Sequence, residues 1–168
     1  MKIGLISDTH SFWDETIPQY FKECDEIWHA GDIGESGQIM EQLNKIAPSI
    51  AVYGNIDTPE FQRTYPENLF IEREGVKIFI THIGGKPPSY NPRVRKLIQS
   101  EKPDVFICGH SHILRAMPDK KHNNLLYLNP GAAGNQGFHK IRTMMRFKIN
   151  NGKIEKLEVI ELGKRGGI

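Results

Sequence analysis

The sequence predicts an α/β fold in which two sheets pack face to face and helices cover the outside. Strand and helix patterns alternate over the first 54 residues, and strand patterns dominate the remainder. The alternating part implies parallel strands joined by right-handed crossovers. The later, mainly antiparallel part supplies strands for a second sheet that can cover the first. A length of 168 residues suits a single domain over residues 1–168.

The first part of the chain contains three short apolar runs separated by two helical patterns. Runs rich in Ile and Val predict buried strands at residues 3–7, 26–30 and 50–53. A helix is expected at residues 14–23, with Pro18 tolerated in its first turn. A clearer helix covers residues 36–46, where Ser36 can cap the start and Pro48 ends the helix.

The second part begins with a hairpin and then becomes rich in strands. Strands at 68–73 and 76–81 are joined by Glu74-Gly75, which is typical of a tight hairpin. A Gly/Pro-rich loop at 84–88 precedes a helix at 92–100. Further strands are expected at 105–108, 113–117, 125–128, 143–149 and 154–160, with Asn150-Asn151-Gly152 as the turn between the last two.

Composition and charge exclude several classes of protein. The 38% hydrophobic and 25% charged content is that of an ordinary globular protein, and a net charge of +2 does not favour binding to nucleic-acid polymers. No apolar run is long enough to cross a membrane, and Asp8 interrupts the first run before a signal peptide could form. Cys24 and Cys108 suggest neither a disulfide framework nor a metal pair. We expect a cytoplasmic protein, and a homo-oligomer is compatible with the sequence.

Five of the apolar runs lead directly into residue types that bind metal ions. A single aspartate at a strand end is more often a helix cap, and a single histidine is more often a hydrogen-bonded core residue. Repetition at the same topological place favours a site, because functional groups gather beyond the carboxyl ends of the strands in open α/β sheets. The residues concerned are Asp8, His10, Asp32, Asn55, Asp57, His82, His110 and His112.

The residue types in this set indicate which metals would bind. Asp8 and His10 are two positions apart, so on an extended segment both would face one ion. The carboxylate of Asp32 has two oxygens and could bridge two ions. Carboxylate, amide oxygen and imidazole together suit transition metals better than magnesium or calcium. We therefore expect two divalent transition metal ions, with manganese favoured over iron, zinc or nickel.

The same motifs, in the same order, resemble those of the calcineurin-like metallophosphoesterases, and in size the chain is similar to their small single-domain phosphodiesterase branch in prokaryotes. The resemblance implies a four-layer α/β/β/α sandwich with two mixed central sheets. It also implies that one metal is held by Asp8, His10, Asp32 and His112, and the other by Asp32, Asn55, His82 and His110, with Asp32 as the bridge. The matching motifs are Asp8-x-His10, Gly31-Asp32, Gly54-Asn55-x-Asp57, Thr81-His82 and Gly109-His110-Ser111-His112, and the segment 129–132 extends the similarity.

This resemblance implies an enzyme that hydrolyses small phosphate esters, with diesters favoured over monoesters. Two cations about 3.5–4 Å apart can share a water molecule and turn it into a hydroxide that attacks phosphorus in line. Asp57 is a candidate for orienting a neighbouring histidine or the Asn55 loop, although a purely turn-stabilising role fits equally. His139 is a second candidate, which either reaches the cleft or faces solvent. His29 lies within a strand, where a structural hydrogen bond is the expected role.

The chain departs from the family pattern at two positions. Many members carry a histidine after the asparagine, and that histidine protonates the leaving group; this chain has Ile56 instead. The family usually has glycine directly after the histidine that corresponds to His82, whereas this chain has Ile83. Because isoleucine cannot donate a proton, we expect activated diesters to be better substrates than alkyl monoesters.

Two other functions are compatible with the sequence. One is a phosphomonoesterase. The other is a metal-binding scaffold or interaction module, as in the retromer subunit that resembles this family but has lost ligand residues. Here all seven expected ligand positions are filled, and this favours the enzyme.

Overall fold

The first sheet is assembled from both ends of the chain. The computed structural model describes residues 1–166. Three N-terminal strands run parallel, as the crossover pattern predicts, and two C-terminal strands extend the sheet in antiparallel fashion beyond β1. The order is β12-β11-β1-β2-β3. The strands are β1 (Lys2–Ile6), β2 (Glu26–His29), β3 (Ser49–Ala51), β11 (Ile141–Asn150) and β12 (Lys153–Lys164).

The second sheet is formed by the middle of the chain, in the order β4-β5-β8-β10-β9. Its three inner strands are parallel and its two edge strands are antiparallel to their neighbours. Both large sheets are therefore mixed, as expected. The strands are β4 (Asn68–Arg73), β5 (Val76–Thr81), β8 (Val105–Ile107), β9 (Arg115–Asp119) and β10 (Leu125–Asn129), and a separate two-stranded hairpin consists of β6 (Gly85–Lys86) and β7 (Ser89–Tyr90).

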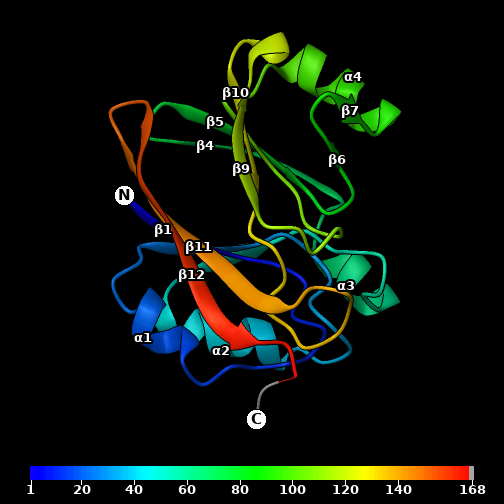
Figure 1. The fold of residues 1–168 in the computed structure, drawn as a ribbon, viewed down its shortest axis with the longest axis vertical. Coiled ribbons are helices and arrows are strands. Elements are labelled where there is room, and N and C mark those ends of the chain that lie inside the picture. Colours follow the sequence, from blue (N-terminus) through cyan, green and yellow to red (C-terminus); the bar gives the residue numbers. More distant parts are fainter. Residues whose placement is uncertain (167–168) are drawn as a thin grey trace.

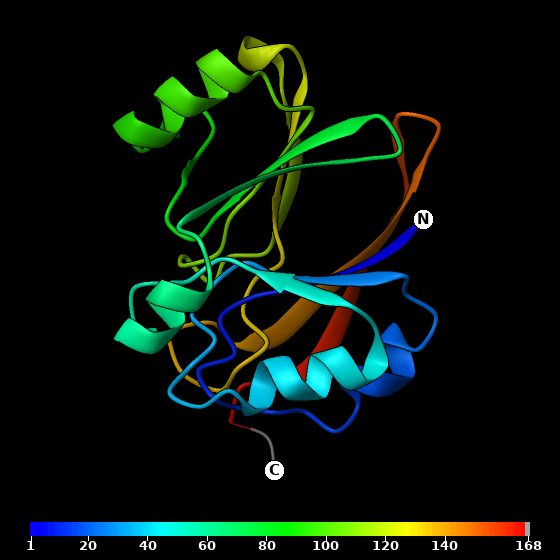
Figure 2. The same cartoon turned by 180° about the vertical axis from the view of Figure 1, so that it is seen from behind.

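The helices complete a four-layer sandwich. Figure 1 shows α1 (Ile17–Phe21) and α2 (Gln38–Ile46) beneath the sheet that contains β1 and β11, with α4 (Pro92–Glu101) at the opposite end. Seen from behind in Figure 2, α2 lies along the outer face of the first sheet, and α3 (Pro59–Thr64) lies in the connection from β3 to β4. The expected α/β/β/α architecture is confirmed. Within the described residues, no helix has the length and apolar character needed to cross a membrane.

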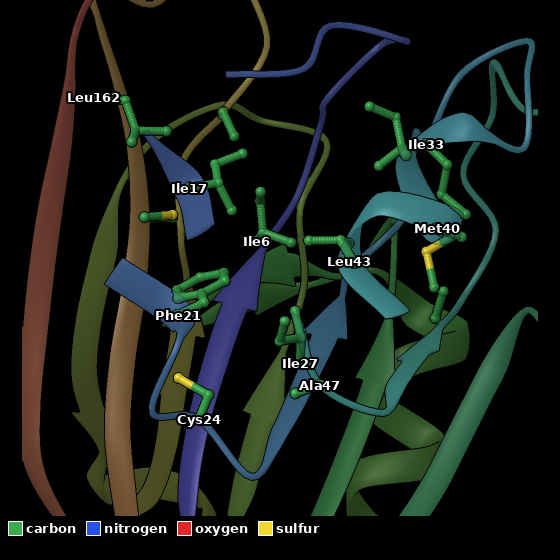
Figure 3. Close-up of a cluster of buried hydrophobic side chains, with 14 of the residues drawn as sticks. Ile6, Ile17, Phe21, Cys24, Ile27, Ile33, Met40, Leu43, Ala47 and Leu162 are labelled. Atoms are coloured by element: carbon green, nitrogen blue, oxygen red, sulfur yellow. The ribbon is translucent and has the colours of Figure 1, made fainter. Parts of the chain in front are cut away.

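Alternating side chains of the strands fill the spaces between these layers. Ile3 and Leu5 face the second sheet, whereas Ile6 belongs to the cluster between the first sheet and helices α1 and α2. Figure 3 shows that cluster, with Phe21 of α1 and Leu43 of α2 close to the strands. A third cluster lies between the second sheet and α4. Since the inner strands are buried on both faces, they appear in the sequence as continuous apolar runs.

Both predicted hairpin turns are confirmed, because the two central residues of each have positive φ angles. The values are 47° and 79° at Glu74 and Gly75, and 47° and 77° at Asn151 and Gly152. Positive φ at both positions is the geometry of a type I′ turn, whose twist matches that of the flanking strands.

Several details differ from the sequence predictions. The later strands do not all form the second sheet, because β11 and β12 return to β1. Ser36 does not cap α2, which begins after Gly37 without a side-chain cap. Helix α3 was not predicted, since its six residues are too few to show a helical period, although Thr58 accepts the capping hydrogen bond from Phe61 N–H. The predicted loop at 84–88 contains β6 and leads into β7.

Candidate metal centre

The loops that follow β1, β2, β5 and β8 bring six of the predicted residues together in two adjacent groups. Within each group, one potential ligand atom per residue lies within 4.8 Å of the others. The two groups share a boundary at Asp32, whose Oδ2 is 3.2 Å from His82 Nε2 and 3.6 Å from His10 Nε2. The first group is Asp8, His10 and His112, and the second is Asp32, His82 and His110.

The backbone at these residues is not extended, so the predicted geometry at Asp8 and His10 is wrong. Both have positive φ angles, 54° and 47°, and nevertheless their side chains reach the same group. Hydrogen bonds from Asp8 N–H to Gly31 O and from His10 N–H to Asp32 O hold the loops together. Left-handed backbone at non-glycine residues costs about 1–3 kcal/mol each and persists where surrounding structure enforces it. The same conformation recurs at Asp32, His110 and His112.

The carboxylate of Asp8 is held by one oxygen and leaves the other without a hydrogen bond. Its Oδ2 accepts hydrogen bonds from the Ser7 hydroxyl at 2.6 Å and from His110 N–H at 3.2 Å. Its Oδ1 is buried and has no hydrogen-bond partner among the described residues. That free oxygen lies 3.1 Å from His112 Nε2. The carboxylate is thus fixed in an orientation that presents one oxygen to the first group.

A chain of hydrogen bonds defines the tautomer of His112. The Gly134 carbonyl can only accept, so His139 Nε2, at 3.0 Å, must donate to it. In a neutral imidazole the other nitrogen then accepts, so His139 Nδ1 accepts a hydrogen bond from His112 Nδ1–H at 3.2 Å. His112 Nε2 is consequently left with a lone pair. Two acceptors, this nitrogen and Asp8 Oδ1, therefore face each other, and a cation between them would relieve their repulsion.

His82 shows the same arrangement in the second group. Its Nδ1 is 2.8 Å from the Ala30 carbonyl, to which it must donate. Its buried Nε2 has no hydrogen-bond partner among the described residues and points at Asp32 Oδ2. Burial lowers the pKa of His82, but the nearby carboxylates of Asp32 and Asp8 outweigh burial and raise the pKa overall. The site therefore attracts positive charge at this nitrogen.

Asp57 organises the loop that carries Asn55. One carboxylate oxygen accepts a hydrogen bond from Gly34 N–H at 2.8 Å, and the other accepts from Gly54 N–H at 2.7 Å. Asp57 thus ties the loop after β2 to the loop after β3, and within the described residues none of its hydrogen bonds is with a histidine. Asn55 itself is exposed and lines a cavity of about 150 Å³ together with His82. This places Asn55 beside the second group.

Gly54 has no room for a side chain. A Cβ at this position would lie 2.1 Å from Asp32 Oδ1 and 2.3 Å from Asp32 N. The neighbouring Ile56 N–H donates to the same Asp32 oxygen at 3.1 Å. The Gly-Asn-Ile sequence therefore brings backbone into direct contact with the carboxylate that separates the two groups.

The sequence family follows from comparison with known proteins. The family model of the calcineurin-like phosphoesterase superfamily domain matches residues 1–152. The chain belongs to this superfamily. No curated protein sequence matches it.

Solved structures with the same calcineurin-like fold cover almost the whole chain. Wild-type Vps29 from Entamoeba histolytica, complexed with Zn²⁺, is 18% identical, with a TM-score of 0.73 and coverage of 97% of this chain and 100% of that one. An archaeal phosphodiesterase is 24% identical, with a TM-score of 0.71 and coverage of 96% and 99%. A predicted phosphoesterase from Streptococcus pneumoniae TIGR4 is 22% identical, with a TM-score of 0.70 and coverage of 96% and 89%.

His29 supports the two aspartate loops of this calcineurin-like chain, in line with its expected structural role. Its Nδ1 accepts from Gly31 N–H at 3.2 Å, so its Nε2 donates to the Thr9 hydroxyl at 2.9 Å. Thr9 in turn donates to the Ile33 carbonyl at 2.9 Å. Complete burial lowers the pKa of His29 to about 3, so the imidazole is neutral.

Two supporting residues were not predicted from the sequence. Thr9 and Ser7 are small polar residues next to Asp8, and only the folded loops show which carbonyl or carboxylate each hydroxyl reaches. Asn129, in the segment that extends the family similarity, donates to Gly109 O at 2.9 Å and to Ser111 Oγ at 3.1 Å. It thereby fixes the loop that carries His110.

Proposed function

We propose that this protein is a metal-dependent phosphodiesterase that hydrolyses small phosphate esters in the cytoplasm. The observation that supports the proposal best is the pairing of acceptor atoms in two adjacent groups. Asp8 Oδ1 faces His112 Nε2, and Asp32 Oδ2 faces His82 Nε2. Acceptors buried without donors favour bound cations.

The proposed ligand sets follow these groups. One divalent ion would be held by Asp8, His10, Asp32 and His112. The other would be held by Asp32, Asn55, His82 and His110, with Asp32 shared by both. The mixture of oxygen and imidazole donors favours manganese, and iron, zinc and nickel are compatible alternatives. The Entamoeba histolytica Vps29 of the same fold was solved in complex with Zn²⁺, which is compatible with a divalent ion in this protein.

The proposed catalytic role of the protein is to bind and orient. Two divalent cations, when bound, activate water and neutralise charge on the phosphoryl oxygens. The Ser7 hydroxyl and the His110 N–H fix the Asp8 carboxylate. His110 is exposed, and its pKa is lowered by burial of part of the ring and by the neighbouring His82, which favours the neutral ligand form. No covalent nucleophile is required, and Ile56 provides no proton for the leaving group.

A chelator should abolish hydrolysis, and manganese should restore it best. The physical reason is that the candidate ligand atoms would repel one another without cations. The measurement is the rate with bis(4-nitrophenyl) phosphate after dialysis against a chelator and after addition of each metal. A panel of alkyl and aryl monoesters, assayed in parallel, distinguishes a phosphodiesterase from a phosphomonoesterase. Full activity of metal-free protein would contradict the proposal.

A scaffold role is the alternative, because Vps29 proteins are among the structural neighbours. What favours the enzyme is the complete set of ligand residue types around the two groups. A protein that binds metal tightly but hydrolyses no ester in the panel would support the scaffold instead.

We further propose that His139 acts on the metal through His112 rather than on the substrate. Both ring nitrogens of His139 are engaged, one by Gly134 O and the other by His112. A histidine ligand whose other nitrogen has a hydrogen-bond partner keeps its tautomer and orientation. Gly137 packs against the His112 ring, since a Cβ at this glycine would lie 2.2 Å from His112 Nδ1.

The His139→Ala variant should therefore bind metal about 10–100-fold more weakly, the usual effect of removing such a partner. Manganese affinity is measured by calorimetry, independently of any activity. Phe138→Ala is the matched control, because that neighbouring side chain is fully exposed and should leave the affinity unchanged. Equal affinities for the His139 variant and the parent protein would show that the contact is only structural.

A further inference from the structure

A cavity of about 360 Å³ adjoins His110 on the side of the second sheet. Its walls are the β6–β7 hairpin, the loop after β8 and the start of β9. We call it the hairpin pocket; the residues important here are Gly85, Lys86, His110, Ile113, Arg115 and Tyr127. Its volume lies in the range of small-molecule sites. Because His110 is in its wall, a group bound there would lie next to the second candidate metal group.

Buried hydrogen bonds hold the wall of the hairpin pocket in place. The Tyr127 hydroxyl donates to Gly85 O at 3.0 Å, and Cys108 Sγ lies 3.3 Å from the same hydroxyl. Tyr127 is buried, so its ring forms a fixed surface. Gly85 cannot carry a side chain without a contact of 2.8 Å to Asn91 N. The pocket is therefore a preformed feature of the fold.

Two basic side chains of the pocket have no acidic partner. Within residues 1–166, neither Lys86 nor Arg115 makes an ion pair or a side-chain hydrogen bond. None of the residues that line the pocket is acidic. Lys86 is exposed and Arg115 is half-buried, so both can reorient towards a ligand. The pocket thus offers uncompensated positive charge at its edge.

The smaller cavity beside Asn55 is different. Its lining also includes a positively charged side chain, that of Arg93, but Arg93 Nη2 lies 3.0 Å from Glu67 Oε1. Its positive charge is therefore compensated within the protein. Of the two cavities that flank the second candidate metal group, the hairpin pocket is the one that favours an anion.

Apolar surface occupies the rest of the hairpin pocket. Ile113 is 55% exposed, and it lines the pocket together with the backbone of Gly84, Gly85 and Gly109. Covering this exposed isoleucine with a flat apolar group is favourable, because it removes apolar surface from water. A ring-sized group with a negative charge at its far edge would match both parts of the pocket.

We propose that the hairpin pocket binds one ester group of the substrate, and that Lys86 and Arg115 select an ester group that is ring-sized and carries a negative charge. This rests on the proposed phosphodiesterase function and adds its substrate class. A carboxylate or a phosphate could supply the charge, because both accept charge-assisted hydrogen bonds from lysine and arginine.

The test compares two diesters of the same shape, bis(4-carboxyphenyl) phosphate and bis(4-nitrophenyl) phosphate. The measured quantity is kcat/KM for the carboxylate diester divided by kcat/KM for the nitro diester. Each variant, Lys86→Met and Arg115→Met, should lower this ratio about tenfold relative to the parent protein, mainly by raising KM for the carboxylate diester. Comparing this ratio between variant and parent protein cancels the different reactivities of the two leaving groups. Lys45→Met removes one charge from the exposed surface of α2 and should change neither rate. A bis(4-phosphonophenyl) analogue shows whether a dianion is preferred to a carboxylate.

An unchanged ratio in both variants would overturn the pocket assignment. If neither diester is hydrolysed, the proposed function fails instead, and both compounds then serve as stable ligands. Calorimetric titration into the manganese-loaded protein should still show tighter binding of the carboxylate diester. That preference should disappear in the Lys86 and Arg115 variants, and its absence from the parent protein would refute the proposal.

Discussion

The Asp32→Asn variant is expected to lose hydrolysis of bis(4-nitrophenyl) phosphate by about 10³-fold or more. Asp32 lies between the two groups, with one oxygen near both His10 and His82. Burial alone would raise the pKa of Asp32, but the neighbouring His82 and the hydrogen bond from Ile56 N–H lower it overall, so the residue is ionised. Asparagine keeps the shape and removes the charge. Each cation contributes several kcal/mol to the stabilisation of the transition state, and each 1.36 kcal/mol is a factor of ten.

The measurements that test this prediction are kcat/KM and the metal content per chain. His112→Ala is the comparison, because it removes a proposed ligand from the first group and leaves the second group complete. It should therefore cost less activity than Asp32→Asn. Circular dichroism checks that both variants are folded. If Asp32→Asn retained the metal content and rate of the parent protein, Asp32 would not bridge the two ions.

The sequence was sufficient to predict the layers and the positions of the proposed ligands because both depend on strong local signals. Strands buried on both faces produce continuous apolar runs, and the residues that follow parallel neighbouring strands lie at the same edge of the sheet. Asp8, Asp32, His82 and His110 come together for that reason. The antiparallel return of β11 to β1 was not predictable, because a strand pattern carries no information about which sheet edge it joins.

The roles of the supporting residues depended on three-dimensional contacts between distant loops. His139 is 27 residues from His112, and the hydrogen bond between their rings exists only because the loop after β10 folds back over the site. His29 and Thr9 are similarly separated in sequence and joined in the structure. Lys86 and Arg115 look like any surface bases in the sequence. What distinguishes them is the absence of acidic neighbours around the pocket that they line.

The His139 geometry also restricts the chemistry of the leaving group. A general acid needs a proton on a nitrogen or oxygen that faces the substrate, and His139 has neither nitrogen free. The hydroxyl of the pocket residue Tyr127 already donates its hydrogen bond to Gly85 O. The leaving group of a substrate would thus depart without assistance from these two residues, and this favours esters whose leaving oxygen is already a stable anion.

Ile56→His is expected to raise kcat/KM for alkyl phosphate esters by about 10²-fold, the lower end of what general-acid catalysis supplies. Ile56 is 39% exposed, and its N–H donates to Asp32 Oδ1, so a side chain at this position starts beside the second candidate metal group. The gain should be much smaller for bis(4-nitrophenyl) phosphate, whose leaving group needs no proton. The measurement compares both substrates in the parent protein and the variant at equal metal content.

The pH dependence of this gain identifies its cause. A histidine acts as an acid only when protonated, and its ordinary pKa is about 6.5. The advantage of Ile56→His over the parent protein should therefore be present at pH 6 and decline as the pH rises towards 8. Ile56→Phe supplies a ring without a proton and should show no such advantage. The gain in kcat/KM could instead be independent of pH, or equally large in the phenylalanine variant. Either result would mean that the new ring acts through its shape, and it would contradict the prediction that the site lacks a general acid.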